Sequence, residues 1–201
     1  MKKLFTLAIA LVFMTGMAFA QNNDASITQT GDDHEASIDQ IGADNEASIT
    51  QELTIDGGLA SVLQDGDSNE ATISQTGNQF ASGSATVVQI GDQNFASQSQ
   101  NVFGGSAERT VGIDQDGDGN YASQTQSHSG GGGDVILNIL QEGNDNYATQ
   151  VQSGSTGTKT SLIEQFGNDN MAQTTQTGIG VGHSATVMQE GNSNTATITQ
   201  D

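Results

Sequence analysis

One short motif recurs along this chain and limits the folds that it can adopt. The motif is Gln-x-Gly-x-x-Asn-x-Ala-x-x-x-Gln, and its seven copies begin at Gln40, Gln64, Gln89, Gln115, Gln141, Gln165 and Gln189. A degenerate copy begins at Gln29, where His34 takes the place of the Asn. The seven copies start 24 to 26 residues apart, which is the period of a solenoid coil. The repeat therefore predicts stacked copies of one small unit rather than a single globular core.

Each repeat has a constant part and a variable part. The two Gln residues of a copy are always eleven positions apart, whereas 13 to 15 positions separate the second Gln from the next copy. Glycine clusters such as Gly57-Gly58 and Gly104-Gly105 fall in the variable part. We therefore expect every coil to have one tight corner of fixed geometry and one loose corner.

Alternating segments precede both Gln residues of a copy. Residues 60–64 read Ala-Ser-Val-Leu-Gln and residues 71–75 read Ala-Thr-Ile-Ser-Gln, and such period-two patterns are typical of strands. Coils of two strands, stacked at about 4.8 Å, form two parallel sheets about 10 Å apart. The sequence thus predicts an all-β, two-sheet parallel β-solenoid with cross-β stacking. It consists of strand–arc–strand coils, namely seven repeats preceded by an N-terminal half-coil.

Stacking places identical polar residues above one another. A buried amide is costly only when it is unpaired, and a column of amides pairs every member except those at its ends. We therefore predict self-assembly ladders of Gln and Asn. Their members are Gln40, Asn45, Gln51, Gln64, Asn69, Gln75, Gln89, Asn94, Gln100, Gln115, Asn120, Gln126, Gln141, Asn146, Gln152, Gln165, Asn170, Gln176, Gln189, Asn194 and Gln200.

The tight corner reads Gly-x-x-Asn, because Gly accepts backbone angles that other residues resist and Asn tolerates left-handed turns. The tight-arc glycines are Gly42, Gly66, Gly91, Gly117, Gly143, Gly167 and Gly191. Our hypothesis is that acidic corner residues form one like-charge column that slows assembly until salt, acid or divalent cations relieve it. The alternative is a solvated turn in which Asp is merely common. The acidic residues are Asp44, Asp67, Asp92, Asp118, Asp145 and Asp169.

Central copies replace an apolar inward position by a polar one. Two positions before the second Gln, outer copies have Ile, as at Ile49 and Ile73, whereas central copies have Gln98, Gln124 and Gln150. Two interpretations stay open. Either the middle of the stack contains an extra amide column, or these coils are simply less hydrophobic and less stable.

The first twenty residues differ from the rest. Lys2 and Lys3 precede an apolar run over residues 4–19, and residues 18–20 read Ala-Phe-Ala, a small-residue cleavage signal. A membrane anchor is the alternative, but the run is short for a span. We expect a signal peptide at residues 1–20, an incomplete repeat at 21–39 and seven repeats at 40–201.

Composition argues against several functions. After residue 20 only Arg109 and Lys159 oppose 24 acidic residues, so the formal charge of the mature chain is near −22, which argues against a nucleic-acid partner. There is no Cys, hence neither a disulfide nor thiol chemistry. The three His residues are scattered, without catalytic or metal-ligand spacing. We expect no enzyme activity, no catalytic residues, no cofactor and no metal site.

The repeat resembles the curlin repeat of bacterial curli subunits, whose motif is Ser-x5-Gln-x-Gly-x-x-Asn-x-Ala-x-x-x-Gln. The resemblance covers residues 25–201. The leading Ser is mostly replaced, by Gly58, Gly83, Arg109, Val135, Lys159 and His183. The resemblance implies a cross-β solenoid that polymerises into extracellular amyloid fibres, as their major subunit, for biofilm matrix and cell adhesion. It also implies export through the periplasm and an outer-membrane pore, and a nucleator subunit as partner.

Neither end of the repeat array shows a capping unit. We therefore expect the end coils to bind further copies of the chain head to tail, which gives a filament. Two alternatives stay open. The chain is the minor nucleator of the same fibre, or it is a monomeric secreted β-solenoid that binds a ligand, of the ice-binding or adhesin type.

Overall fold

The computed structural model describes residues 22–53, 57–77, 83–103, 108–129, 133–154, 157–178 and 182–201. The predicted signal peptide, residues 1–20, lies outside these ranges, as do most residues of the loose corners. Within the described ranges the chain forms fifteen β-strands and no helix. None of these residues therefore forms a helix long and apolar enough to cross a membrane.

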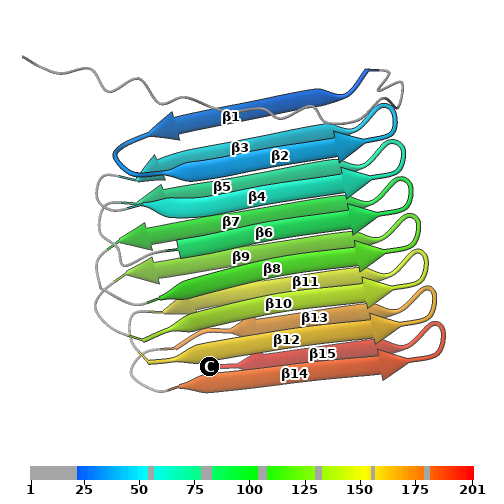
Figure 1. The fold of residues 1–201 in the computed structure, drawn as a ribbon. Coiled ribbons are helices and arrows are strands. Elements are labelled where there is room, and N and C mark those ends of the chain that lie inside the picture. Colours follow the sequence, from blue (N-terminus) through cyan, green and yellow to red (C-terminus); the bar gives the residue numbers. More distant parts are fainter. Residues whose placement is uncertain are drawn as a thin grey trace, which may run out of the picture.

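The strands alternate between two sheets that face each other (Figure 1). Sheet A has eight strands: β1 (Asp24–Thr30), β3 (Glu46–Leu53), β5 (Glu70–Gly77), β7 (Phe95–Phe103), β9 (Tyr121–Ser129), β11 (Tyr147–Gly154), β13 (Met171–Gln176) and β15 (Thr195–Gln200). Sheet B has seven: β2 (Glu35–Ile41), β4 (Gly58–Asp65), β6 (Gly83–Ile90), β8 (Arg109–Asp116), β10 (Val135–Glu142), β12 (Lys159–Phe166) and β14 (His183–Glu190). Each strand pairs in parallel with the strand two places along the chain. The predicted two-sheet parallel β-solenoid is confirmed.

Register keeps every repeat position above its equivalent in the next coil. In sheet B, Gln64 pairs with Gln89, and in sheet A, Gln51 pairs with Gln75. A slip by one residue would turn every inward side chain outward, so the buried face specifies this register strongly. Each column of the solenoid therefore contains one position of the repeat.

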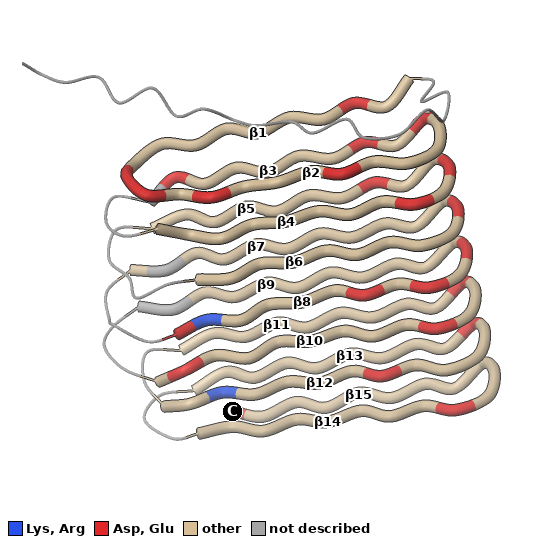
Figure 2. The backbone as a smooth tube through the Cα atoms, viewed as in Figure 1, with Lys and Arg blue, Asp and Glu red and all other residues tan. Residues whose placement is uncertain are grey.

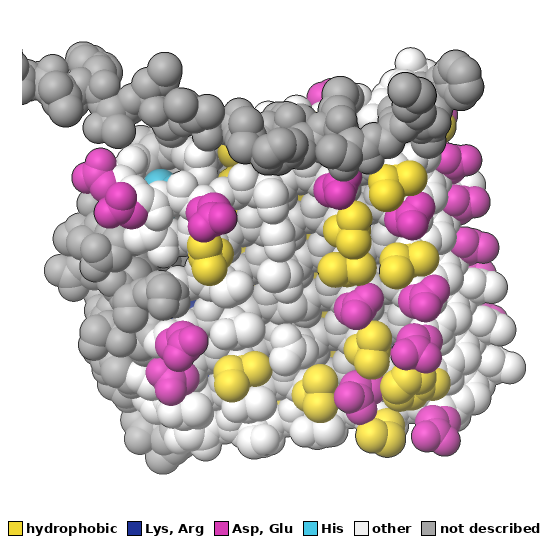
Figure 3. All heavy atoms as spheres, in the orientation of Figure 1, with side chains coloured by type: hydrophobic (Ala, Val, Ile, Leu, Met, Phe, Trp, Pro, Cys, Tyr) yellow, Lys and Arg dark blue, Asp and Glu magenta, His cyan; other side chains and the backbone are white. Residues whose placement is uncertain are grey.

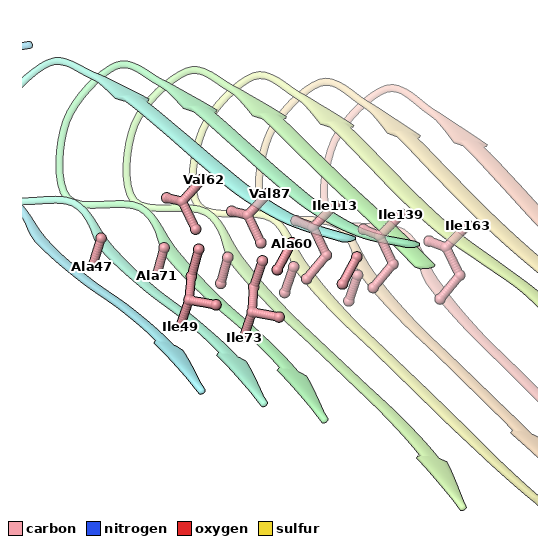
Figure 4. Close-up of a cluster of buried hydrophobic side chains, with 14 of the residues drawn as sticks. Ala47, Ile49, Ala60, Val62, Ala71, Ile73, Val87, Ile113, Ile139 and Ile163 are labelled. Atoms are coloured by element: carbon pink, nitrogen blue, oxygen red, sulfur yellow. The ribbon is translucent and has the colours of Figure 1, made fainter. Parts of the chain in front are cut away.

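The core is a thin layer between the sheets, formed by the inward row of each strand (Figure 4). Ile49 and Ile73 of sheet A and Ile113 and Ile163 of sheet B are almost completely buried. Small Ala residues precede the two of sheet A in the inward row, at Ala47 and Ala71, whereas Val111 and Ser161 take this position in sheet B. Each buried Ile stabilises the fold by about 1.5–3 kcal/mol. Buried Ala, Val and Leu residues extend this apolar layer, and polar side chains fill the other inward positions.

Stacking requires glycine at the tight corner. All seven tight-arc glycines have positive φ, from +96° to +135°. A Cβ on Gly66 would overlap the carbonyl oxygen of Gly91, which lies one coil further along. The next positive-φ position of the corner holds residues such as Asp44, Ser68 and Gln93. The corner is tight because consecutive coils contact each other through their backbones here.

Charged residues are unevenly distributed over this stack. Many acidic residues gather along the tight-corner side, whereas Arg109 and Lys159 begin strands β8 and β12 at the loose-corner side (Figure 2). On the face drawn in Figure 3, exposed apolar side chains are scattered among acidic ones. Sheet B contributes exposed apolar residues such as Leu59, Ile90 and Met188, but acidic neighbours separate them.

Candidate functional site

The first Gln of each repeat forms a continuous hydrogen-bonded column inside sheet B. Every Nε2 donates to the Oε1 of the next Gln at 2.8–2.9 Å, from Gln40 to Gln189. The same nitrogen donates a second bond across the core to a backbone carbonyl of sheet A, as from Gln64 to Glu46 at 3.1 Å. Both N–H groups of an inner Gln are therefore satisfied, and the structure brings the predicted members of this column together within one chain.

The column has a direction, so its two ends differ chemically. Gln40 donates to Gln64 and to the carbonyl of Asp24, and no described side chain donates to its Oε1. Gln189 accepts from Gln165 and donates one bond, to the carbonyl of Met171. An acceptor is thus left open at the N-terminal end and an N–H donor at the C-terminal end.

The Asn residues of the tight corners bind the backbone as well as each other. Oδ1 of Asn45 accepts the backbone N–H of Asn69 at 2.9 Å, and Nδ2 of Asn45 donates to the carbonyl of Gly66 at 2.8 Å. The same pattern continues to Asn194. From Asn94 to Asn194 the side-chain amides also bond to one another, at 2.9–3.2 Å. The Asn side chains therefore bond to the backbone of the neighbouring corner, in addition to the bonds between side-chain amides that we predicted.

One further member of the tight-corner column was missed by the sequence argument. Asn23 accepts the backbone N–H of Asn45 and donates to the carbonyl of Gly42, as the repeat Asn residues do. His34, which the sequence places in the Asn slot of the degenerate copy, lies instead in the corner between β1 and β2, where its Nδ1 accepts the backbone N–H of Gly58 at 3.1 Å. Asn23 was missed because no Gln stands five positions before it.

Comparison with known families finds the curlin associated repeat at residues 20–52, 59–79 and 179–201. The chain contains curlin associated repeats. The matched segments lie at both ends of the stack, while the motif and the coil geometry continue through the curlin repeats between them. No curated protein and no solved structure matches the chain.

The second Gln of each curlin repeat forms a column in sheet A that is interrupted in the middle. Bonds of 2.7–2.8 Å join Gln29, Gln51, Gln75 and Gln100, and another joins Gln176 to Gln200. At Gln126 both amide atoms are buried and have no hydrogen-bond partner in the structure. Nε2 of Gln100 and Oε1 of Gln152 are also unpartnered. The predicted ladder is therefore present at both ends of sheet A and absent at Gln126.

The extra amide column of the central curlin repeats is present. Gln98 donates to Gln124 at 3.1 Å, and Gln124 donates to Gln150 at 2.9 Å. Each of the three also donates to a carbonyl of sheet B, at 2.8–2.9 Å. These Gln residues are almost completely buried. Of the two interpretations left open above, the structure supports the amide column.

The interruption coincides with a buried cation. A Cβ on Gly83 would lie 3.7 Å from Nε2 of Gln75 and 3.9 Å from Oε1 of Gln100, so this slot faces the second Gln column. One coil further along, the slot holds Arg109, which is 2% exposed. Burial lowers the pKa of Arg109 to about 10. Along the stack, the guanidinium of Arg109 therefore lies between the coils of Gln100 and Gln126, where the bond between these two side chains is missing.

Lys159 occupies the same slot two coils after Arg109. It is 1% exposed, and its Nζ donates to the carbonyl oxygens of Ser153 and Gly178. Burial also lowers its pKa. Both positive residues of the predicted mature chain are thus inside the loose-corner end of the core, where at least Lys159 ties backbone carbonyls of neighbouring arcs.

The acidic residues do not form the single column that we predicted. Asp67, Asp92 and Asp118 directly follow the corner glycine, whereas Asp44, Asp145 and Asp169 are one position later, with left-handed backbone. Each carboxylate of the first group accepts the backbone N–H of the preceding coil at 2.8–2.9 Å. Asn144, Asn168 and Asn192 continue this column with the same bond. The first group therefore combines a structural hydrogen bond with like-charge proximity.

Aromatic side chains form a short stripe on the outer face of sheet A. The ring centroids of Phe95 and Tyr121 are 4.9 Å apart, and those of Tyr121 and Tyr147 are 4.7 Å apart, with nearly parallel planes. Glu70 precedes this stripe and Met171 follows it in the register. Stacking along the sheet accounts for these contacts.

Comparing two Gln residues tests the energetic role of the intact column. Gln115→Ala removes two column bonds and leaves Gln89 and Gln141 with unpaired amide groups, so we expect a loss of about 2–4 kcal/mol. Gln126→Ala removes the same volume from an equally buried position but breaks no bond, and should cost roughly 2 kcal/mol less. Denaturant unfolding of the freshly prepared monomer measures both. Equal losses would contradict a stabilising role for the column.

Arg109→Val should stabilise the monomer, because Val135 fills the same slot in the next coil without a buried charge. We expect a gain of about 1–3 kcal/mol near neutral pH. The pKa of Arg109 is about 10 in the folded chain, below its ordinary value of 12.5. The penalty is therefore fully present below pH 10 and declines as the pH rises above it. Thermal unfolding at pH 7 and pH 10.5, with the exposed substitution Thr110→Val as control, measures the gain and its decline.

Proposed function

We propose that the chain is the structural subunit of an extracellular curli-like fibre, in which copies add head to tail. The family match supports a curli-type structural protein of the cell exterior. Head-to-tail addition is supported by the Gln column of sheet B, in which every Gln donates in the same direction along the stack. It ends in an open acceptor at Gln40 and in an open donor at Gln189. A second copy offers the complement of each end.

The end strands offer the same complementarity in their backbones. β2 and β14 are the outer strands of sheet B, and each pairs with a single neighbour in the described stack. Unpaired strand edges bind further strands readily. Because the two ends differ, the contact between copies is head to tail and does not close on itself, so growth gives a filament.

Seven regular coils suit a major fibre subunit better than a nucleator. A long stack contributes many hydrogen bonds to each column along the fibre, and these bonds strengthen the polymer along its axis. By family resemblance, its partners are further copies of itself, a nucleator subunit and an outer-membrane export pore. The fibre would serve biofilm matrix and cell adhesion.

We propose that the acidic column acts on folding of the exported chain. Asp67, Asp92 and Asp118 stack inside one subunit, about 4.8 Å apart. At this spacing adjacent charges repel by about 1 kcal/mol in water, and salt screens the repulsion. In a head-to-tail contact Asn192 would meet Ala43 in this slot, where neither is charged. The repulsion therefore opposes formation of the stack and not docking of folded copies.

Fibre growth tests the proposed function directly. The mature chain from Gln21, incubated at micromolar concentration, should form fibres visible by electron microscopy, with thioflavin fluorescence. Their diffraction should show reflections near 4.8 Å and 10 Å. A chain that stays monomeric, with the strand content of the solenoid, would reject the fibre and favour a monomeric binding protein.

Replacing Asp67, Asp92 and Asp118 together by Asn tests the acidic column. Asn keeps the hydrogen-bond acceptor, as Asn144 does naturally, and removes the charge. We expect a shorter lag before fibre growth and loss of most of its salt dependence. The control replaces Glu52, Glu164 and Glu190 by Gln, which gives the same change in net charge at sites without an acidic strand neighbour. Equal effects of both triple variants would rule out a specific column.

A further inference from the structure

The two sheets contain different numbers of strands. In the described stack, sheet A has eight strands and sheet B has seven. The extra strand is β1, which lies at one end of the stack next to β3 and contacts β2 of sheet B through the bond from Gln40 to the carbonyl of Asp24 (Figure 1). The other end finishes with the pair β14 and β15. Stacking of intact copies therefore cannot continue both sheets at once.

Retention of β1 would leave a gap at every junction. If β15 of one copy paired with β1 of the next, β14 and β2 would be separated by the width of one strand. The open amide groups of Gln189 and Gln40 would then face each other across this gap, and Ile38 and Val187 would lack their neighbours in the inward row. Burying unpaired amides and strand edges in this way is costly.

β1 and β15 are nearly the same strand in sequence. Residues 25–29 read Ala-Ser-Ile-Thr-Gln, and residues 196–200 read Ala-Thr-Ile-Thr-Gln. In the register of β1, Ile27 lies beside Ile49 and Gln29 beside Gln51. Ile198 and Gln200 occupy the corresponding positions of β15. β15 of a second copy therefore fits the edge of β3 residue for residue.

We propose that β1 is a placeholder strand, which β15 of the adjoining copy displaces from β3 when the copies dock. This inference rests on the head-to-tail assembly proposed above. Displacement lets β14 pair with β2 at the same time, so both sheets and both Gln columns continue through the junction. Gln189 then donates to Gln40, and Gln200 donates to Gln51. The occupied edge of β3 is the docking site for a second copy of this chain.

Strand pairings and charges both favour the displacement of β1 by β15. If β1 is retained, each junction gains one strand pairing, between β15 and β1. If β1 is displaced, the junction loses the pairing of β1 with β3 and gains two, β15 with β3 and β14 with β2. The net gain is the same, but only displacement closes the gap in sheet B. Asp24, Ala25, Ser26 and Thr28 of β1 are already exposed, so its displacement uncovers mainly Ile27 and Gln29, whose places Ile198 and Gln200 of the second copy take. Asp24 also lies beside Glu46 in the register, and exchange places the uncharged Thr195 there instead. Removing this like-charge pair stabilises the junction.

A disulfide that locks β1 onto β3 provides the test. Ser26 and Ser48 are register partners on the outer face. The Cα atoms of Cys residues at these two positions would be about 4.8 Å apart, which is within the range of a disulfide. The matched control is Ser97→Cys with Ser123→Cys, the same repeat position on strands β7 and β9, which never separate. The chain has no native Cys to interfere.

We expect oxidised Ser26→Cys/Ser48→Cys monomer to elongate preformed seeds at least tenfold more slowly than the reduced form, with full recovery on reduction. The oxidised control should elongate as the wild type does. Equal elongation rates for the locked and reduced chains would overturn the inference while leaving head-to-tail assembly intact. If reduced and wild-type chains form no fibres, the proposed function fails and this inference fails with it.

The axial rise of wild-type fibres gives a second readout that needs no variant. Displacement leaves seven strands per subunit in each sheet, or about 34 Å along the fibre, whereas retention gives eight levels, or about 38 Å. Mass per unit length, measured by scanning transmission electron microscopy, distinguishes these values. A rise of about 38 Å would overturn the inference.

Discussion

The structure depends on one interaction, the bond between a buried Gln amide and the same amide one coil away. Polar residues occupy much of the inward surface, and each would destabilise the fold if left unpaired. In the intact column each inner Gln donates once along the stack and once across it, as Gln115 does to Gln141 and to the carbonyl of Phe95. The column thereby fixes the register within each sheet and the spacing between the sheets. Its only unsatisfied members are at the ends, which links the stability of the monomer to its tendency to bind another copy.

The repeat made most of this architecture predictable. A constant spacing of eleven residues between the Gln residues fixes one corner, and parallel stacking then places like above like. This reasoning found the strands and the tight-arc glycines, and it offered the central column of Gln98, Gln124 and Gln150 as one of two interpretations. The structure added the backbone bonds of the Asn residues. Those bonds depend on how the corner folds, and residue spacing does not contain that information.

The predictions that were wrong had grouped residues by their chemical type and not by their position in the repeat. Asp44 and Asp67 both look like acidic corner residues, yet they are one position apart in a turn where each position has its own backbone conformation. Likewise, the spacing of Gln126 predicts a ladder member, but Arg109 lies at the level of its missing bond to Gln100, and the bond to Gln152 is missing as well. Arg109 comes from the variable part of the repeat, about which the motif says nothing. Loose corners are therefore where a periodic sequence predicts least.

Folding of one chain and growth of the fibre place nearly the same five-residue sequence, from β1 or from β15, at the edge of β3. The two processes differ because β1 is tethered to the same chain. β1 is joined to β2 through Gly31 and a short corner, and its effective concentration at the edge of β3 is in the millimolar range. β15 of another copy, as a single strand, would compete poorly against it. A docking coil, however, brings β14 together with β15, and the second pairing at β2 compensates for the missing tether. An extra half-coil thus delays single-strand contacts between copies and admits only a partner that offers both strands in register.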